Sequence, residues 1–78
     1  MRVLIVEDDT DIREQLIDTM KSEGYVVDAA SEGSQGLYFA LEYPIDIAIV
    51  DLGLPEVSGL EIIRKLRDAG KDLSLIHI

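Results

Sequence analysis

The sequence predicts an α/β fold, in which a parallel β-sheet is covered by helices on both faces. Short apolar runs of strand length alternate with segments in which apolar residues recur every three or four positions. This alternation is typical of βαβ units, whose crossover helices cover the sheet. The order along the chain is β-α-β-α-β-α-β, and its 78 residues contain no linker or internal repeat. We therefore expect a single domain with a modest core.

The chain begins with a predicted strand and a predicted helix. Val3–Val6 is a run of four apolar residues, three of them β-branched, and predicts a buried strand. The acidic and hydroxyl residues of 7–11 suit the beginning of a helix, because they cap free N–H groups and complement the helix dipole. Gly24 marks the expected end of this helix. Its expected inner face consists of Ile12, Leu16 and Met20, which recur at a spacing of four.

A shorter strand and a weaker helix follow. Residues 25–30 predict the strand, and the internal Asp28 indicates one more exposed face, hence an edge position in the sheet. Ser31 is the expected N-cap of the second helix. Gly33 and Gly36 weaken that helix by roughly 1 kcal/mol each relative to alanine. Its expected inner face consists of Leu37, Ala40 and Leu41.

The second half of the chain predicts two more strands around a third helix. Residues 46–50 predict a strand buried on both faces, because they become a continuous apolar run after the first position. Ser58 and Glu61 fit a capping box at the start of the third helix, which ends near Gly70. Residues 73–78 predict the fourth strand. The expected inner face of the helix consists of Leu60, Ile63 and Leu66.

The composition limits the classes of function. A formal net charge of -9, from 16 acidic against 7 basic residues, repels nucleic acid phosphates and anionic membranes. The absence of cysteine excludes disulfides and thiolate metal sites. No apolar run approaches the roughly 20 residues that span a bilayer, and the early acidic residues exclude a signal peptide. We expect a cytoplasmic protein in which this segment binds neither membranes nor nucleic acid directly.

Acidic side chains follow two of the predicted strands at the points where the strands end. Glu7 and Asp8 follow the first strand, and Asp51 follows the third. An aspartate is also common in ordinary turns, so Asp51 alone does not indicate a site. If the two strands are neighbours, about 4.8 Å apart, the three carboxylates converge at the sheet edge where α/β proteins bind ligands. A magnesium ion (Mg2+) relieves their mutual repulsion, and one carboxylate of such a site can accept a phosphoryl group.

Two separated motifs carry a resemblance to a known family. They are Val6-Glu7-Asp8-Asp9 after the first strand and Val50-Asp51-Leu52-Gly53-Leu54-Pro55, with Ser58-Gly59, after the third. From Met1 to about Gly70 the chain resembles the response-regulator receiver domain of two-component systems. Within that family it is similar to PhoP-type members of the winged-helix transcription regulators. The resemblance implies a flavodoxin-like, doubly wound parallel sheet with the strand order 2-1-3-4.

The resemblance also implies roles for individual residues. Asp51 corresponds to the phosphoacceptor, Asp8 to a direct metal ligand, and Glu7 to its acidic partner. Gly53 corresponds to the position whose backbone carbonyl binds the metal. The implied Mg2+ ligands are therefore Glu7, Asp8, Asp51 and the Gly53 carbonyl. The implied reaction is phosphoryl transfer from the phosphohistidine of a sensor histidine kinase to Asp51. The chain would then be a phosphoacceptor rather than an enzyme, in a parent protein that controls transcription.

Other parts of the family pattern have no counterpart in this sequence. Pro55 and Gly59 match positions that shape the site, but the family's serine or threonine after the fourth strand and its lysine after the fifth are absent. Ser74 is not equated with the former. A DNA-binding domain is absent as well. We therefore interpret residues 1–78 as a partial, truncated receiver domain.

Two further expectations depend on this interpretation. An unpaired apolar sheet edge favours pairing with another chain, so we expect self-association through the exposed edge. The alternative hypothesis for the function is a receiver-like protein-interaction fragment that is never phosphorylated, because its catalytic set is incomplete.

Overall fold

The computed structural model of the protein describes residues 1–51, 53–54 and 58–77. The elements in order are β1 (Arg2–Val6), α1 (Thr10–Ser22), β2 (Val26–Ala30), α2 (Gly33–Glu42), β3 (Ile47–Val50), α3 (Gly59–Asp68) and β4 (Ser74–His77). The four strands form one parallel sheet in the order β2-β1-β3-β4. The predicted strand order and the edge position of the second strand are therefore confirmed.

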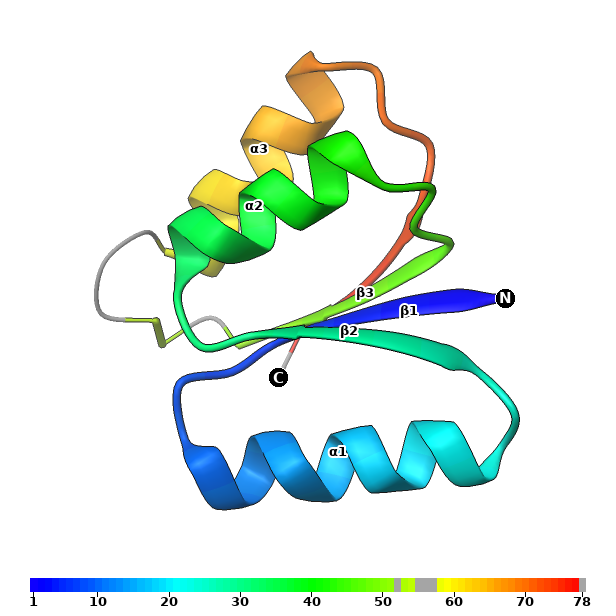
Figure 1. Cartoon of the computed structure of the whole chain (residues 1–78). Helices are drawn as coiled ribbons and strands as arrows, with labels where there is room; N and C mark the ends of the chain where they lie inside the picture. Colours follow the sequence, from blue (N-terminus) through cyan, green and yellow to red (C-terminus); the bar gives the residue numbers. More distant parts are fainter. Residues whose placement is uncertain (52, 55–57, 78) are drawn as a thin grey trace.

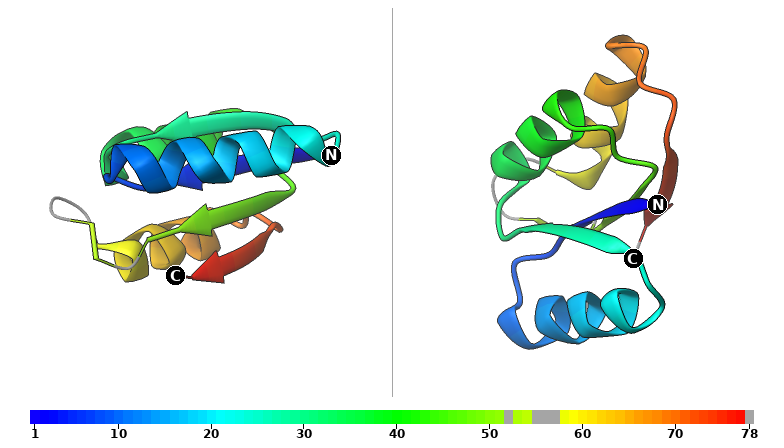
Figure 2. Two further views of the ribbon diagram at one scale, coloured as in Figure 1. Left: turned by 90° about the horizontal axis from the view of Figure 1, so that it is seen from below. Right: turned by 45° about the vertical axis from the view of Figure 1, so that its right-hand side comes forward.

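Helices lie on both faces of the sheet. α1 covers one face, whereas α2 and α3 lie side by side on the other (Figure 1). All four strands point toward the same end of the sheet (Figure 2). Alternate residues of β1 enter different cores, because successive side chains of a strand point to opposite faces. Leu4 and Val6 pack under α2 and α3, and Val3 and Ile5 pack against α1.

The inner faces of two helices differ from the sequence-based expectation. Ile12 of α1 is 45% exposed and Leu60 of α3 is 61% exposed, so both predicted inner positions are wrong. For Leu60 the reason is the phase of the helix, because a helix turns by about 100° per residue and a shift of one position moves a side chain off the buried face. Ile12 keeps the spacing of four to Leu16, but it lies in the first turn of α1, at the end of the helix. In α3 the buried residues are Gly59, Ile62 and Leu66. In α1 the residues that pack on the sheet are Leu16, Ile17 and Met20.

The three helices begin with different caps. Asp9 caps α1 by accepting the N–H of Ile12 at 3.0 Å, and Ser58 caps α3, as predicted, by accepting the N–H of Glu61 at 3.2 Å. Within the described residues Glu61 makes no return bond, so the capping box is only half formed. The prediction of Ser31 as a cap is wrong, because α2 begins later, after Glu32, which forms no side-chain cap bond.

The late start of α2 accompanies a close approach to the sheet at Gly36. A Cβ atom at this position would stand 2.6 Å and 2.8 Å from the two γ-carbons of Val6. Contacts that short do not occur without displacement of one partner. The glycine therefore lets α2 lie directly on the end of β1, one residue before Glu7.

Arg2 joins three segments at the opposite end of the sheet. Its guanidinium donates to the carboxylate of Asp28 on β2, with Nε 2.6 Å from Oδ2. The backbone N–H of Arg2 donates to Asp46 at 2.7 Å, just before β3. The guanidinium carbon also lies 4.8 Å from the ring centroid of Tyr43. Asp28, which led to the prediction of an edge strand, is thus paired across to β1.

Two other expectations concern the outside of the molecule. Among the helices of the described residues, none has both the length and the apolar character that crossing a bilayer requires. In the same part of the chain β4 is an edge strand, and its Ile76 is 49% exposed. Self-association through this edge stays a prediction, as does the interpretation of residues 1–78 as a partial domain.

Candidate functional site

The ends of β1 and β3 position the acidic residues. Val6 of β1 is paired in register with Val50 of β3, and the N–H of Asp51 donates to the Val6 carbonyl at 3.0 Å. On the other side, the N–H of Glu7 donates to the carbonyl of Ala30 at 3.1 Å. Backbone hydrogen bonds therefore hold Glu7 and Asp51 beside each other at the carboxyl edge of the sheet, as the sequence predicts.

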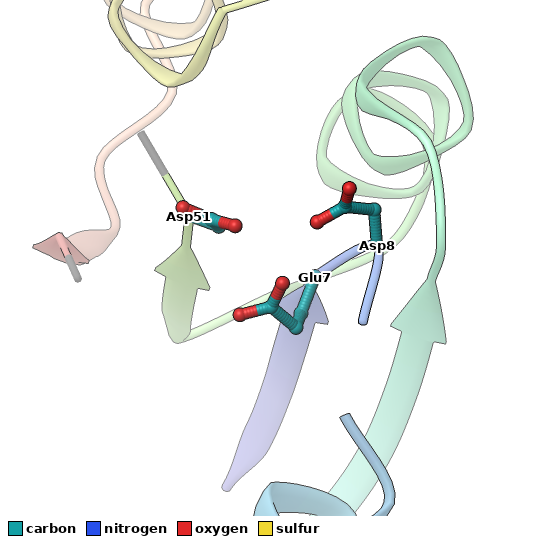
Figure 3. A group of neighbouring side chains, drawn as sticks. All are labelled: Glu7, Asp8 and Asp51. Carbon is teal, nitrogen blue, oxygen red and sulfur yellow. The ribbon is translucent and has the colours of Figure 1, made fainter. Parts of the chain in front are cut away.

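Three carboxylates meet at this edge. Glu7, Asp8 and Asp51 each offer one oxygen atom, and these atoms all lie within 4.8 Å of one another. Figure 3 shows Glu7 and Asp8 at the end of β1 and Asp51 at the end of β3, with their carboxylates facing a common space. Glu7 is buried, at 4% exposure, Asp51 is half-buried and Asp8 is exposed. The cluster therefore extends from the protein interior to the solvent.

The environment of Glu7 disfavours its ionised form. Burial raises the pKa of Glu7, and the neighbouring Asp51 and Asp8 carboxyl groups raise it further. The N–H of Asp9, which donates to Glu7 Oε2 at 3.1 Å, opposes this rise. Among the described residues the ion pair that forms is Arg2–Asp28, and no lysine or arginine pairs with the three clustered carboxylates. The negative charge of the cluster is thus left for another cation.

The donor set fits a magnesium ion. All three groups are carboxylates, which are hard oxygen ligands, and the exposed side at Asp8 leaves room for the water ligands that Mg2+ retains. Each of the three side chains offers one oxygen atom, and these atoms lie within 4.8 Å of one another, so Glu7, Asp8 and Asp51 would together hold the ion.

Two described residues after β3 are Gly53 and Leu54. The N–H of Gly53 donates to Asp51 Oδ1 at 2.8 Å, and Leu54 is buried in the core. Gly59, at the start of α3, is also buried. The predicted role of the Gly53 carbonyl as a metal ligand stays a prediction, and Pro55 lies outside the described residues.

Sequence reasoning missed the contact of Arg13 with the same site. Nη1 of Arg13 lies 2.9 Å from the carbonyl oxygen of Glu7 and 3.3 Å from that of Asp8. A basic residue four positions after a helix cap is unfavourable for the helix dipole. That unfavourable placement was the available signal, but the sequence does not show which acceptor the side chain reaches.

Comparison with known proteins agrees with the geometry. Residues 3–78 match the response regulator receiver domain family. The two-component response regulator PhoP of Pseudomonas aeruginosa is 42% identical over 76 residues, which are 97% of this chain and 34% of that protein. The chain therefore spans about a third of the length of the curated relatives it matches. The predicted similarity to PhoP-type regulators is confirmed.

Solved structures show the same likeness. The response regulator TrrA of Thermotoga maritima, in complex with Mg2+ and BeF, is 35% identical with a TM-score of 0.89, and the match covers 95% of this chain and 64% of that one. TrrA in complex with the histidine kinase ThkA is 36% identical with a TM-score of 0.88, covering 97% and 66%. Since the family match includes almost every residue of the sequence, the chain belongs to the response regulator receiver domain family.

Proposed function

We propose that this chain takes a phosphoryl group from a sensor histidine kinase onto Asp51, with Mg2+ held by Glu7, Asp8, Asp51 and the backbone carbonyl of Gly53. The convergence of three carboxylates within 4.8 Å, at the ends of two adjacent strands, carries this proposal. The family membership of the chain and the Mg2+–BeF complex of TrrA support it.

Asp51 and Gly53 have different roles in the proposed phosphoryl transfer. An oxygen of Asp51 forms a bond to phosphorus while the P–N bond of phosphohistidine breaks, and the imidazole nitrogen leaves with the bonding electrons and takes a proton from water. Asp51 is half-buried, so a donor reaches it from solvent. The Gly53 N–H orients Asp51 by holding Oδ1 at 2.8 Å. Bound Mg2+ supplies positive charge that offsets the charge of the phosphoryl oxygens.

The proposed partner is a histidine kinase, and the proposed role of the parent protein is control of transcription. TrrA is bound to the histidine kinase ThkA in a solved structure, and PhoP of Salmonella typhimurium, a relative at 42% identity, is a transcriptional regulatory protein. In this proposal the kinase provides the phosphoryl group and the chain accepts it. The net charge of -9 opposes direct contact of this segment with DNA.

The proposal is tested by incubating the chain with acetyl phosphate and Mg2+ and measuring its intact mass. We expect a mass increase of one phosphoryl group, which disappears in Asp51→Asn and when EDTA removes the metal. Asp18→Asn is the matched control, because Asp18 is exposed on α1, and it should be labelled like the unchanged protein.

Either of two results would contradict the proposal. Label that persists in Asp51→Asn would show that Asp51 is not the acceptor. A folded chain that Mg2+ and acetyl phosphate leave unlabelled would support the alternative, a receiver-like interaction module that is not phosphorylated.

A further inference from the structure

We infer that Arg13 is a positioning residue of the metal site, which fixes the backbone that carries Glu7 and Asp8. The inference rests on the proposed function, because it assigns Arg13 a role in Mg2+ binding. Arg13 lies on α1, and its side chain reaches back to the loop between β1 and α1. It contacts the backbone of the site and leaves the carboxylates to the metal.

The side chain of Arg13 binds two successive carbonyl groups. Nη1 carries two N–H groups, and it lies 2.9 Å from the carbonyl oxygen of Glu7 and 3.3 Å from that of Asp8. The backbone N–H of Arg13 donates to the next carbonyl, that of Asp9, at 2.9 Å. One residue therefore satisfies three consecutive carbonyls of the loop. This fixes the peptide planes on either side of Asp8, and with them the directions in which Glu7 and Asp8 leave the backbone.

The loop has few other constraints at Asp8. Glu7 is held by the bond from its N–H to Ala30, and Asp9 is held by its bonds to Glu7 and Ile12. Asp8 is exposed, and the Arg13 contact to its carbonyl is the hydrogen bond that the described structure gives it. The position of the most exposed carboxylate of the site thus depends on Arg13.

The choice of acceptor matters for metal binding. An arginine that paired with Glu7 or Asp8 through the carboxylates would compete with a cation for the same oxygens. The Arg13 hydrogen bonds go to carbonyl oxygens instead. They also offset the unfavourable position of a cation near the N-terminus of α1, where the helix dipole is positive. The charge of Arg13 is therefore unfavourable for α1, whereas its hydrogen bonds stabilise the loop between β1 and α1.

The test compares Mg2+ affinity in Arg13→Met, Arg13→Lys and the control Arg64→Met. Methionine keeps an apolar stem but donates no hydrogen bond, whereas lysine keeps the charge and N–H donors. Arg64 is exposed on α3, so its substitution removes one positive charge without touching the loop. Mg2+ dissociation constants are measured from the dispersed amide peaks of 1H–15N spectra, which come from folded protein, and Tm is measured by circular dichroism.

We expect Arg13→Met to weaken Mg2+ binding about tenfold, since outer-shell partners of metal ligands typically contribute 10- to 100-fold. Arg13→Lys should recover part of this loss, and Arg64→Met should bind like the unchanged protein. A lower Tm with unchanged Mg2+ affinity in Arg13→Met would overturn the inference, because a merely structural residue gives that result. Equal losses in Arg13→Met and Arg64→Met would also overturn it, since total charge would then explain the effect.

A second readout separates this inference from the proposed function. In metal-free protein the carbonyl 13C shifts of Glu7 and Asp8 report the hydrogen bonds that these oxygens accept. We expect both shifts to move in Arg13→Met and to stay in Arg64→Met. If the unchanged chain binds no Mg2+, the proposed function fails, and unmoved carbonyl shifts then overturn the positioning role as well. If Arg13→Met does not fold, the affinity and carbonyl shifts of Arg13→Lys decide, and values identical to those of the unchanged protein would contradict a role for the guanidinium geometry.

Discussion

Glu7 is only 4% exposed, so its carboxylate has little contact with water. Burial raises the pKa of Glu7, and the nearby Asp51 and Asp8 carboxyl groups add to the rise. Ionised Glu7 therefore opposes folding when no cation is bound, although the same charge would favour a bound metal. The proposed metal site therefore favours an ionised Glu7, whereas the stability of the metal-free protein favours a neutral one.

The substitution Glu7→Gln should raise the Tm of the metal-free protein at neutral pH. The folded pKa of Glu7 lies above the value of about 4.3 for an unfolded glutamate. The folded state therefore binds the proton more tightly, and the stability contributed by Glu7 is present below that value and lost as the pH rises through the folded pKa. The Tm difference between Glu7→Gln and the unchanged protein should be larger at about pH 8 than at about pH 4.

The matched control for this prediction is Glu14→Gln. Glu14 is exposed on α1, so its substitution should change Tm little at either pH. Addition of Mg2+ should stabilise the unchanged protein more than Glu7→Gln. A lower Tm of metal-free Glu7→Gln at neutral pH would show that the ionised side chain is accommodated without cost.

The sequence was sufficient to identify the acidic residues but not their differences. Glu7, Asp8 and Asp51 were predictable because each follows an apolar run, and parallel neighbours bring such ends together. That Glu7 is buried while Asp8 is exposed depends on the path of the loop. The contacts of Arg13 depend on the same path, which no pattern of residue types encodes.

Among the elements, strands were easier to predict than helix faces. A continuous apolar run such as Ile47–Val50 indicates a strand that helices cover on both faces of the sheet. The structure has β3 at these residues. A helical face depends on the phase of the helix, which its first turn sets, and Leu60 was therefore assigned to the wrong side. The start of α2 was predicted at Ser31 from its cap chemistry, whereas the close packing of Gly36 on Val6 accompanies a later start.

The packing of α2 on β1 leads to a double-mutant prediction. Gly36→Ala should lower the free energy of unfolding by about 1–2 kcal/mol, because overpacking costs about 1–3 kcal/mol and the gain in helix propensity returns up to about 1 kcal/mol. In a Val6→Ala background the added methyl group has space, so the same substitution should be neutral or stabilising. Urea unfolding of the four proteins in this cycle gives the coupling energy, which we expect to exceed about 1 kcal/mol.

The control for this cycle is Ser34→Ala, an exposed position of α2 where no close contact with β1 limits the side chain. Ser34→Ala should change the free energy of unfolding by no more than about 0.5 kcal/mol. If Gly36→Ala leaves the free energy of unfolding unchanged, the Val6 side chain can move aside at no energetic cost. The packing of α2 on β1 would then not require a glycine at position 36.

In the molecule as a whole, the site arises from the order of the strands. β1 and β3 are adjacent although α1, β2 and α2 separate them in the sequence. The crossover connections that bring them together also place a helix on each face, so the strand ends open onto one edge. This arrangement was predictable from the alternation of strands and helices, and the specific order 2-1-3-4 came from the family resemblance.

The most direct measurement is a 1H–15N spectrum of the chain followed through a Mg2+ titration. We expect dispersed peaks, with saturable shifts that are confined to residues around Glu7, Asp8, Asp51 and Gly53, and that disappear in Asp51→Asn. That result would establish a metal site at the ends of β1 and β3. A dispersed spectrum in which Mg2+ moves no peak, or moves the exposed acidic residues of α1 as much as those of the cluster, would contradict a magnesium site at this edge of the sheet.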